Sequence, residues 1–147
     1  MWQRIQTLYL GISTILTASM FFSNFATVLG PDGASEKIGY GEYVPYLLFL
    51  IMLTAANVTA IATFKARMLQ MRVCILTAIL QLAFQLWLAV DIIRHWNEMV
   101  FSITAVFPLV AIILDLLAAR GIFMDEAIVH AASHLRGDRR KRDGSKR

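Results

Sequence analysis

The chain has 147 residues, of which 58% are hydrophobic, and its formal net charge is +4. A soluble domain of this length cannot hide so many apolar side chains, because small domains bury only a modest fraction of their surface. Composition therefore excludes an ordinary soluble protein, and the single cysteine, Cys74, excludes an intramolecular disulfide.

Four apolar stretches follow one another along the chain and predict four membrane-spanning helices. The first stretch lies between the charges of Arg4 and Asp32 and is too long for a typical signal-peptide core, so we expect an uncleaved span. Pro108 predicts a kink in the fourth helix, because proline removes one helical hydrogen bond. The expected spans cover residues 5–29, 43–64, 73–93 and 99–119.

The segment after the fourth span has a different character. Residues 121–135 alternate apolar and polar positions at helical spacing, which predicts an amphipathic helix lying on the cytoplasmic membrane surface. Residues 136–147 hold seven Lys and Arg and predict a disordered tail. We expect this tail to contact anionic lipid headgroups rather than nucleic acid, because the bilayer is already adjacent.

The distribution of basic residues predicts the orientation of the chain. With four spans, twelve of the 14 Lys and Arg residues fall on the side of both termini, and only Lys37 and Arg94 fall on the other side. Basic residues are enriched in cytoplasmic loops. The chain is therefore predicted to be a multi-pass membrane protein with cytoplasmic N- and C-termini.

Three stretches carry a resemblance to a known family. They are residues 1–10 (MWQRIQTLYL), the connector 64–72 (FKARMLQMR), and residues 120–136, which begin Arg-Gly-Ile. Together with the four spans, they resemble an uncharacterised four-helix membrane protein family of Bacteroidetes, domain of unknown function 4293. The resemblance implies a bacterial inner-membrane location and no particular activity.

A set of polar residues inside the spans is the candidate intramembrane site. Asp115 is the one charged residue well inside an apolar stretch, and such groups are functional candidates. It is expected to lie shallow, about 7.5 Å from Arg120 along the helix axis. It could relay protons or bind a cation, or it could reach the surface or bond Lys65 or Arg67. The full candidate cluster comprises Asp115, Gln81, Gln85, Asn57 and Thr54.

A second set of residues forms the candidate cytoplasmic surface. Glu126, His130 and His134 follow one another at intervals of four, but ligands spread over two turns of one helix cannot converge on one metal ion. We expect a solvated stripe and predict no metal, cofactor or catalytic residues. The whole surface comprises Lys65, Arg67, Arg72, Arg120, Glu126, His130 and His134.

The sequence therefore predicts an all-α fold, a four-helix antiparallel transmembrane bundle followed by a cytoplasmic amphipathic helix. The expected function is that of a non-enzymatic accessory or scaffold subunit of a membrane assembly, with a membrane protein as its partner. A small transporter or channel subunit that uses the polar residues of the bundle is the alternative. It requires Asp115, Gln81, Gln85 and Asn57 to line one wet cavity.

Overall fold

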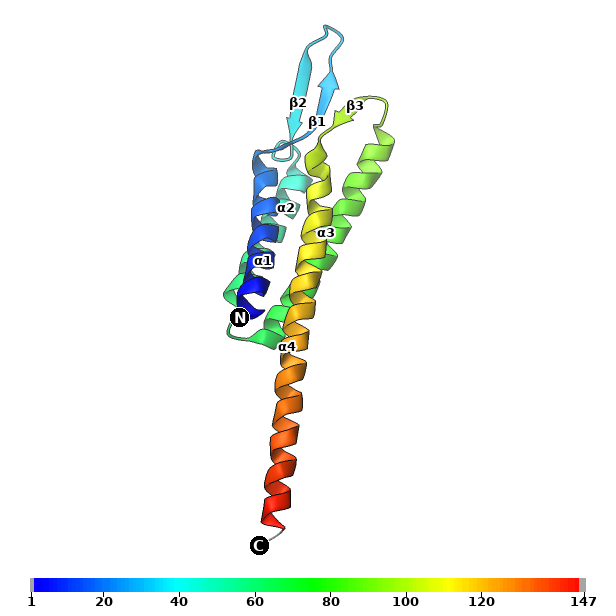
Figure 1. The fold of residues 1–147 in the computed structure, drawn as a ribbon. Helices are drawn as coiled ribbons and strands as arrows, with labels where there is room; N and C mark the ends of the chain where they lie inside the picture. Colours follow the sequence, from blue (N-terminus) through cyan, green and yellow to red (C-terminus); the bar gives the residue numbers. More distant parts are fainter. Residues whose placement is uncertain (1, 146–147) are drawn as a thin grey trace.

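The computed structural model describes residues 2–145, and four long helices lie side by side in it (Figure 1). Successive helices run in opposite directions, and α1 and α3 both contact α2 and α4, so the four close into a ring. All four are long and apolar enough to cross a membrane. Their bounds are Trp2–Ser19 for α1, Val44–Ala62 for α2, Arg67–Arg94 for α3 and Phe107–Gly144 for α4.

The two ends of the bundle differ. At one end, which we call the connector end, the start of α1 lies near residues 63–66 between α2 and α3 (Figure 1). At the opposite sheet end, the chain forms three short strands. These are β1 (Asn24–Leu29), β2 (Ser35–Gly39) and β3 (Met99–Phe101), in the antiparallel order β2-β1-β3. The prediction of an all-α fold is therefore incomplete.

The first expected span, residues 5–29, is wrong in its second half. The α-helix ends at Ser19, and a 3-10 turn, η1 (Met20–Phe22), leads into β1. The Ser19 and Ser23 hydroxyls both donate to backbone carbonyls in the preceding turn, a local bond that competes with helix continuation. The apolar residues of β1 then pair with two strands instead of continuing through lipid.

A tight turn with the sequence Gly-Pro-Asp-Gly, residues 30–33, joins β1 to β2. The Gly33 amide donates to the Gly30 carbonyl at 3.0 Å, and Gly33 adopts a φ of +73°, which glycine accommodates without steric cost. A register shift between Asn24 and Ala26 marks a bulge at Phe25. Both Phe25 and Ala26 are buried, so the bulge lets two consecutive strand residues face the core.

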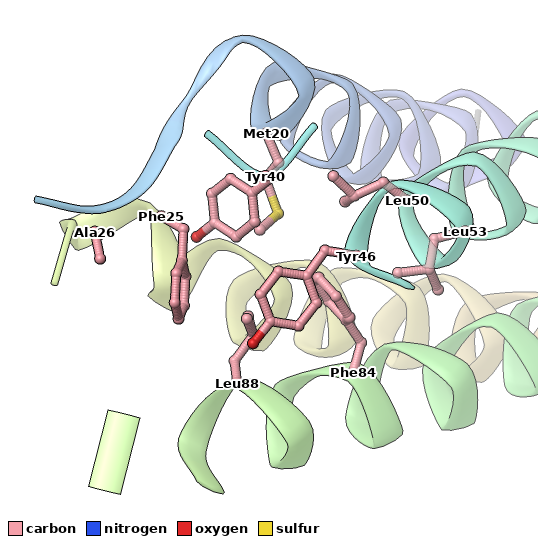
Figure 2. Packing of buried hydrophobic residues seen from close by; sticks show 9 residues of the cluster. All are labelled: Met20, Phe25, Ala26, Tyr40, Tyr46, Leu50, Leu53, Phe84 and Leu88. Carbon is pink, nitrogen blue, oxygen red and sulfur yellow. The ribbon is translucent and has the colours of Figure 1, made fainter. Parts of the chain in front are cut away.

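An aromatic cluster joins the sheet to the helices (Figure 2). The Phe25 ring meets Tyr40, Tyr46 and Phe101 edge-on, at centroid distances of 5.6, 5.3 and 5.4 Å. Edge-to-face contacts of this kind add to the energy of apolar burial. The Tyr46 hydroxyl also donates to the carboxylate of Asp91 in α3. The sheet is thus fixed to α2 and α3 by packing as well as by the chain.

The third and fourth helices begin at residues other than those predicted. α3 begins at Arg67, so most of the basic connector is helical. α4 begins only at Phe107, after β3 and a 3-10 turn, η2 (Ile103–Val106). Pro108 therefore lies in the first turn of α4, where its missing N–H has no helical acceptor to lose. The kink predicted inside the fourth span is wrong for this reason.

The region after the fourth span also differs from the prediction. α4 continues unbroken to Gly144 and extends past the connector end along its own axis, where the sequence predicts a separate surface helix and a disordered tail (Figure 1). Gly121 does not interrupt it, because the Gln6 side chain of α1 occupies the space beside it. The Gln6 amide then donates to Asp125 at 2.8 Å. Residues 146 and 147 of the expected tail lie outside the described residues.

Candidate functional site

Each of the four helices contributes a buried polar side chain to the middle of the bundle. None of them is more than 3% exposed. We call this set the polar centre; it consists of Ser13 and Thr17 of α1, Asn57 of α2, Gln81 of α3 and Asp115 of α4.

One side of the polar centre is joined by hydrogen bonds. The Ser13 hydroxyl donates to the Asn57 side-chain carbonyl at 3.4 Å, and the Asn57 amide donates to the Thr17 hydroxyl at 3.4 Å. Thr17 in turn donates to the backbone carbonyl of Ser13 at 2.9 Å. The three side chains therefore satisfy one another across α1 and α2, as buried polar groups in lipid must.

The other side of the polar centre lacks such partners. Both carboxylate oxygens of Asp115 and both amide atoms of Gln81 are buried, and none of the described residues forms a hydrogen bond with them. Ser13 and Gln81 are the polar side chains that face the Asp115 carboxylate. Native proteins seldom leave buried polar atoms unpaired, and each such atom calls for an explanation.

Asp115 lies level with the middle of α3. Its neighbour Gln81 is close to the midpoint of the 28-residue helix α3, about 21 Å along the axis from Arg67. Among the described residues Asp115 forms no ion pair, so a bond to Lys65 or Arg67, one of the alternatives that the sequence leaves open, is not made in this structure. Both oxygens are buried, so the side chain does not reach the surface either.

Two predicted members of the cluster form a layer of their own. Thr54 and Gln85 lie one helical turn nearer the sheet end than Asn57 and Gln81, and both are half-buried. The Thr54 hydroxyl and the Gln85 carbonyl oxygen are buried atoms without a partner among the described residues. The sequence analysis included these four residues in the candidate cluster, but it omitted Ser13 and Thr17. Their spacing of four on α1 was the available signal.

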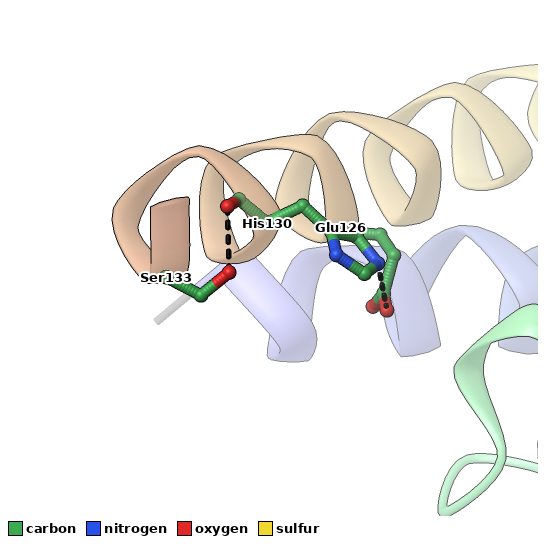
Figure 3. A network of polar contacts seen from close by, with 3 residues as sticks. All are labelled: Glu126, His130 and Ser133. Atoms are coloured by element: carbon green, nitrogen blue, oxygen red, sulfur yellow. Dashed lines mark hydrogen bonds and ion pairs between the residues drawn. The ribbon is translucent and has the colours of Figure 1, made fainter. Parts of the chain in front are cut away.

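The residues of the predicted cytoplasmic surface are spread over the connector end. Lys65, Arg72 and Arg120 are exposed, and Arg67 is half-buried. On the extended part of α4, His130 lies 3.5 Å from Glu126, and the Ser133 hydroxyl donates to the His130 carbonyl (Figure 3). His134 is exposed one turn further on. Within the described part of the chain, no group of three His, Cys, Asp or Glu residues could hold a metal ion.

The outward faces of the helices define the class of protein. Large apolar side chains on these faces are more than half exposed, among them Leu48, Ile79, Leu86 and Ile113. The members of the polar centre, in contrast, point inward. This reversal of the soluble pattern, on four helices of spanning length, is that of a multi-pass membrane protein.

The chain belongs to the family described as Domain of unknown function (DUF4293), whose pattern matches residues 2–135. No curated protein and no solved structure matches the chain.

Proposed function

We propose that the protein is a non-enzymatic accessory or scaffold subunit of an assembly in the bacterial inner membrane. In this proposal both termini are cytoplasmic, because twelve of the 14 basic residues then lie on the cytoplasmic side. One observation carries the proposal. α4 leaves the bundle as a straight helix that still bears apolar side chains on its exposed surface (Figure 1).

This extension, residues 126–144, is called the arm here. It is about 28 Å long at 1.5 Å per residue. Ile128, Ala131 and Leu135 follow at intervals of three and four, which puts them on one face of the arm, and Leu135 is 70% exposed. An apolar face on a helix that projects from its own bundle fits a groove or helix of a partner protein. The basic residues beyond Leu135 favour an acidic region on that partner.

The test is affinity purification of the tagged full-length protein from its native membrane in mild detergent, followed by mass spectrometry. Leu135→Ser should remove a stoichiometric membrane partner, because it deletes the apolar side chain at the centre of the arm. Val129→Ser is the matched control, since Val129 is 54% exposed but lies off this face. Wild-type protein without a stoichiometric partner, or equal loss with both variants, would contradict the proposal.

A second candidate function is that of a small transporter or channel subunit, and the polar centre favours it. A charged carboxylate without a protein partner is costly in the membrane interior, and residues of this kind mark ion and proton paths. The polar centre is closed in this structure, since its members are at most 3% exposed. Transport would therefore need a second conformation that opens it.

This candidate predicts that Asp115→Asn abolishes cation or proton flux in proteoliposomes that the wild-type protein supports. Glu98→Gln is the matched control, because it removes an exposed carboxylate near the sheet end. Flux through D115N equal to that of the wild type would contradict the transport candidate. It would leave the accessory role untouched, because that role depends on the arm alone.

A further inference from the structure

A groove of about 460 Å³ opens at the connector end between three helices. Among the described residues that line it, two are cationic and none is acidic. We call it the arginine groove. Its lining includes Arg4 and Gln6 of α1, Ile61 at the end of α2, Phe64 in the turn after it, and Arg67 and Gln70 at the start of α3.

The two arginines come from different helices and remain available. Within the described residues neither Arg4 nor Arg67 forms an ion pair. Arg67 is half-buried, so its charge is partly removed from water without a protein carboxylate to balance it. A guanidinium presents paired N–H donors that match the oxygens of a phosphate. Two of them in one groove favour an anion.

The groove also contains an amide side chain that forms no hydrogen bond within the described residues. Gln70 is only 5% exposed, and within the described residues its side chain forms no hydrogen bond. Gln6 differs, because its amide already donates to Asp125 at 2.8 Å. The Gln70 amide therefore has its own N–H donors available for whatever enters the groove.

The start of α3 adds a third positive contribution. Ala66 precedes the helix and provides no side-chain cap, and the first turn holds no acidic residue. The first N–H groups of a helix have no intrahelical acceptor and carry a partial positive charge. Arg67 and Gln70, which line the groove, both belong to this first turn.

We propose that the arginine groove binds the phosphate of an anionic phospholipid headgroup. The connector end is at the level of the membrane surface when the four helices span a bilayer, so headgroups surround the groove. Ile61 and Phe64, the latter mostly exposed, provide an apolar wall for the glycerol and upper acyl region of the same lipid. A free phosphate ion would leave this wall unused. The site is independent of the arm and of the polar centre.

The experiment measures binding of short-chain phosphatidylglycerol to the purified full-length protein in a neutral detergent, with phosphatidylcholine and inorganic phosphate as the other probes. We expect saturable binding of phosphatidylglycerol alone. Arg4→Gln and Arg67→Gln should each weaken it about tenfold, because one hydrogen bond to a charged group contributes at least that much. The double variant should lose binding.

The matched control is Lys65→Gln with Arg72→Gln, which removes the same charge at the same end but from residues outside the groove lining. The control should change affinity less than about threefold, since these charges act only through the screened surface potential. Arg4→Lys with Arg67→Lys keeps the charge and should bind at intermediate strength, which separates binding from folding. Helical content and elution volume confirm that each variant is folded.

Several outcomes overturn the proposal. Equal loss in the groove variant and its control would show that general surface charge holds the lipid. Inorganic phosphate binding as tightly as phosphatidylglycerol would make the free anion the ligand. Equal affinity for phosphatidylcholine, or no saturable binding by the wild-type protein, would remove the headgroup site altogether.

Discussion

Tyr40 joins segments of the chain that are far apart in the sequence. It is fully buried after β2, and its hydroxyl lies 3.3 Å from the Thr104 hydroxyl. Thr104 donates in turn to the Asn24 carbonyl at 3.1 Å. Burial raises the pKa of Tyr40 above its usual value of 10.0, and the bond to Thr104 offsets part of that rise.

The raised pKa gives stability a dependence on alkaline pH. In the unfolded chain Tyr40 ionises near its ordinary pKa, while the folded protein holds the proton to higher pH. The stabilising effect is therefore complete below about pH 10 and is lost as the pH rises through the folded value. Tyr40→Phe should cost about 1 kcal/mol at neutral pH, where the hydrogen bond is lost.

The measurement is the free energy of unfolding of both proteins in detergent, from neutral pH to about pH 11. The decline above pH 10 should be shallower in Y40F than in the wild type. Phenolate absorbance of the folded proteins provides a direct check. A decline of the same slope in both proteins would mean that Tyr40 ionises as freely in the fold as outside it.

Single residues also show where sequence reasoning reaches its limit. Hydropathy singled out Asp115 and Gln81, because polar residues in apolar stretches are conspicuous. Hydropathy did not predict that the two residues are neighbours. The sequence gives the spacing of Asp115 from Arg120 along one helix, but not its position relative to α3. Ser13 and Thr17 complete the polar centre, yet small hydroxyl residues barely change a hydropathy average. Hydropathy therefore identified three of the five members of the polar centre, and the packing of the helices identified the other two.

At the scale of elements, the helices were more predictable than the segments between them. α2 begins and ends within two residues of the predicted 43–64. Hydropathy predicts that the apolar run from Phe25 to Leu29 continues the first helix. An average hydropathy does not distinguish a turn of a transmembrane helix from a buried strand. The pairing of β1 with both β2 and β3 is a long-range contact that no local window contains.

The sheet-end cluster predicts a large contrast between two neighbouring phenylalanines. Phe25 is 7% exposed with three aromatic rings around it, whereas Phe22 is 93% exposed. Phe25→Ala should lower the free energy of unfolding by about 3–5 kcal/mol, because it leaves a cavity in the core. Phe22→Ala removes the same side chain and should cost less than about 1 kcal/mol.

Chemical or thermal unfolding in one detergent compares the two variants directly. Similar losses for F25A and F22A would mean that the aromatic cluster does not hold the sheet on the helices. A selective loss in F25A would show that the sheet end is part of the cooperative unit.

At the scale of the whole molecule, the arm is the largest departure from prediction. Glycine and a change from apolar to charged residues suggested a break at residue 121. Gly121 is instead a contact position that lets Gln6 of α1 approach α4. A bend at this point would disrupt the Gln6–Asp125 bond, so packing against α1 keeps the helix straight there. Glycine at this position therefore marks close packing of two helices and not the end of one.

The straight arm predicts that its outer half is dispensable for the bundle. A chain ending at residue 136 should unfold within about 0.5 kcal/mol of the full-length protein, because residues 137–142 are exposed and α4 extends past the other helices there (Figure 1). The measurement is thermal unfolding in detergent and in lipid nanodiscs. A clear loss of stability in lipid alone would indicate that the arm lies along the membrane surface.

The strand order has a consequence for synthesis of the chain. β1 is the middle strand, and one of its neighbours, β3, is made about 70 residues later, after α2 and α3 have been inserted. Until then the growing protein presents β1 and β2 as a ribbon in which the edge of β1 that will bind β3 is still open. Such an edge can pair with any extended chain nearby. The period between the synthesis of β2 and that of β3, while α2 and α3 are made, is therefore the one in which a nascent copy is most open to mispairing.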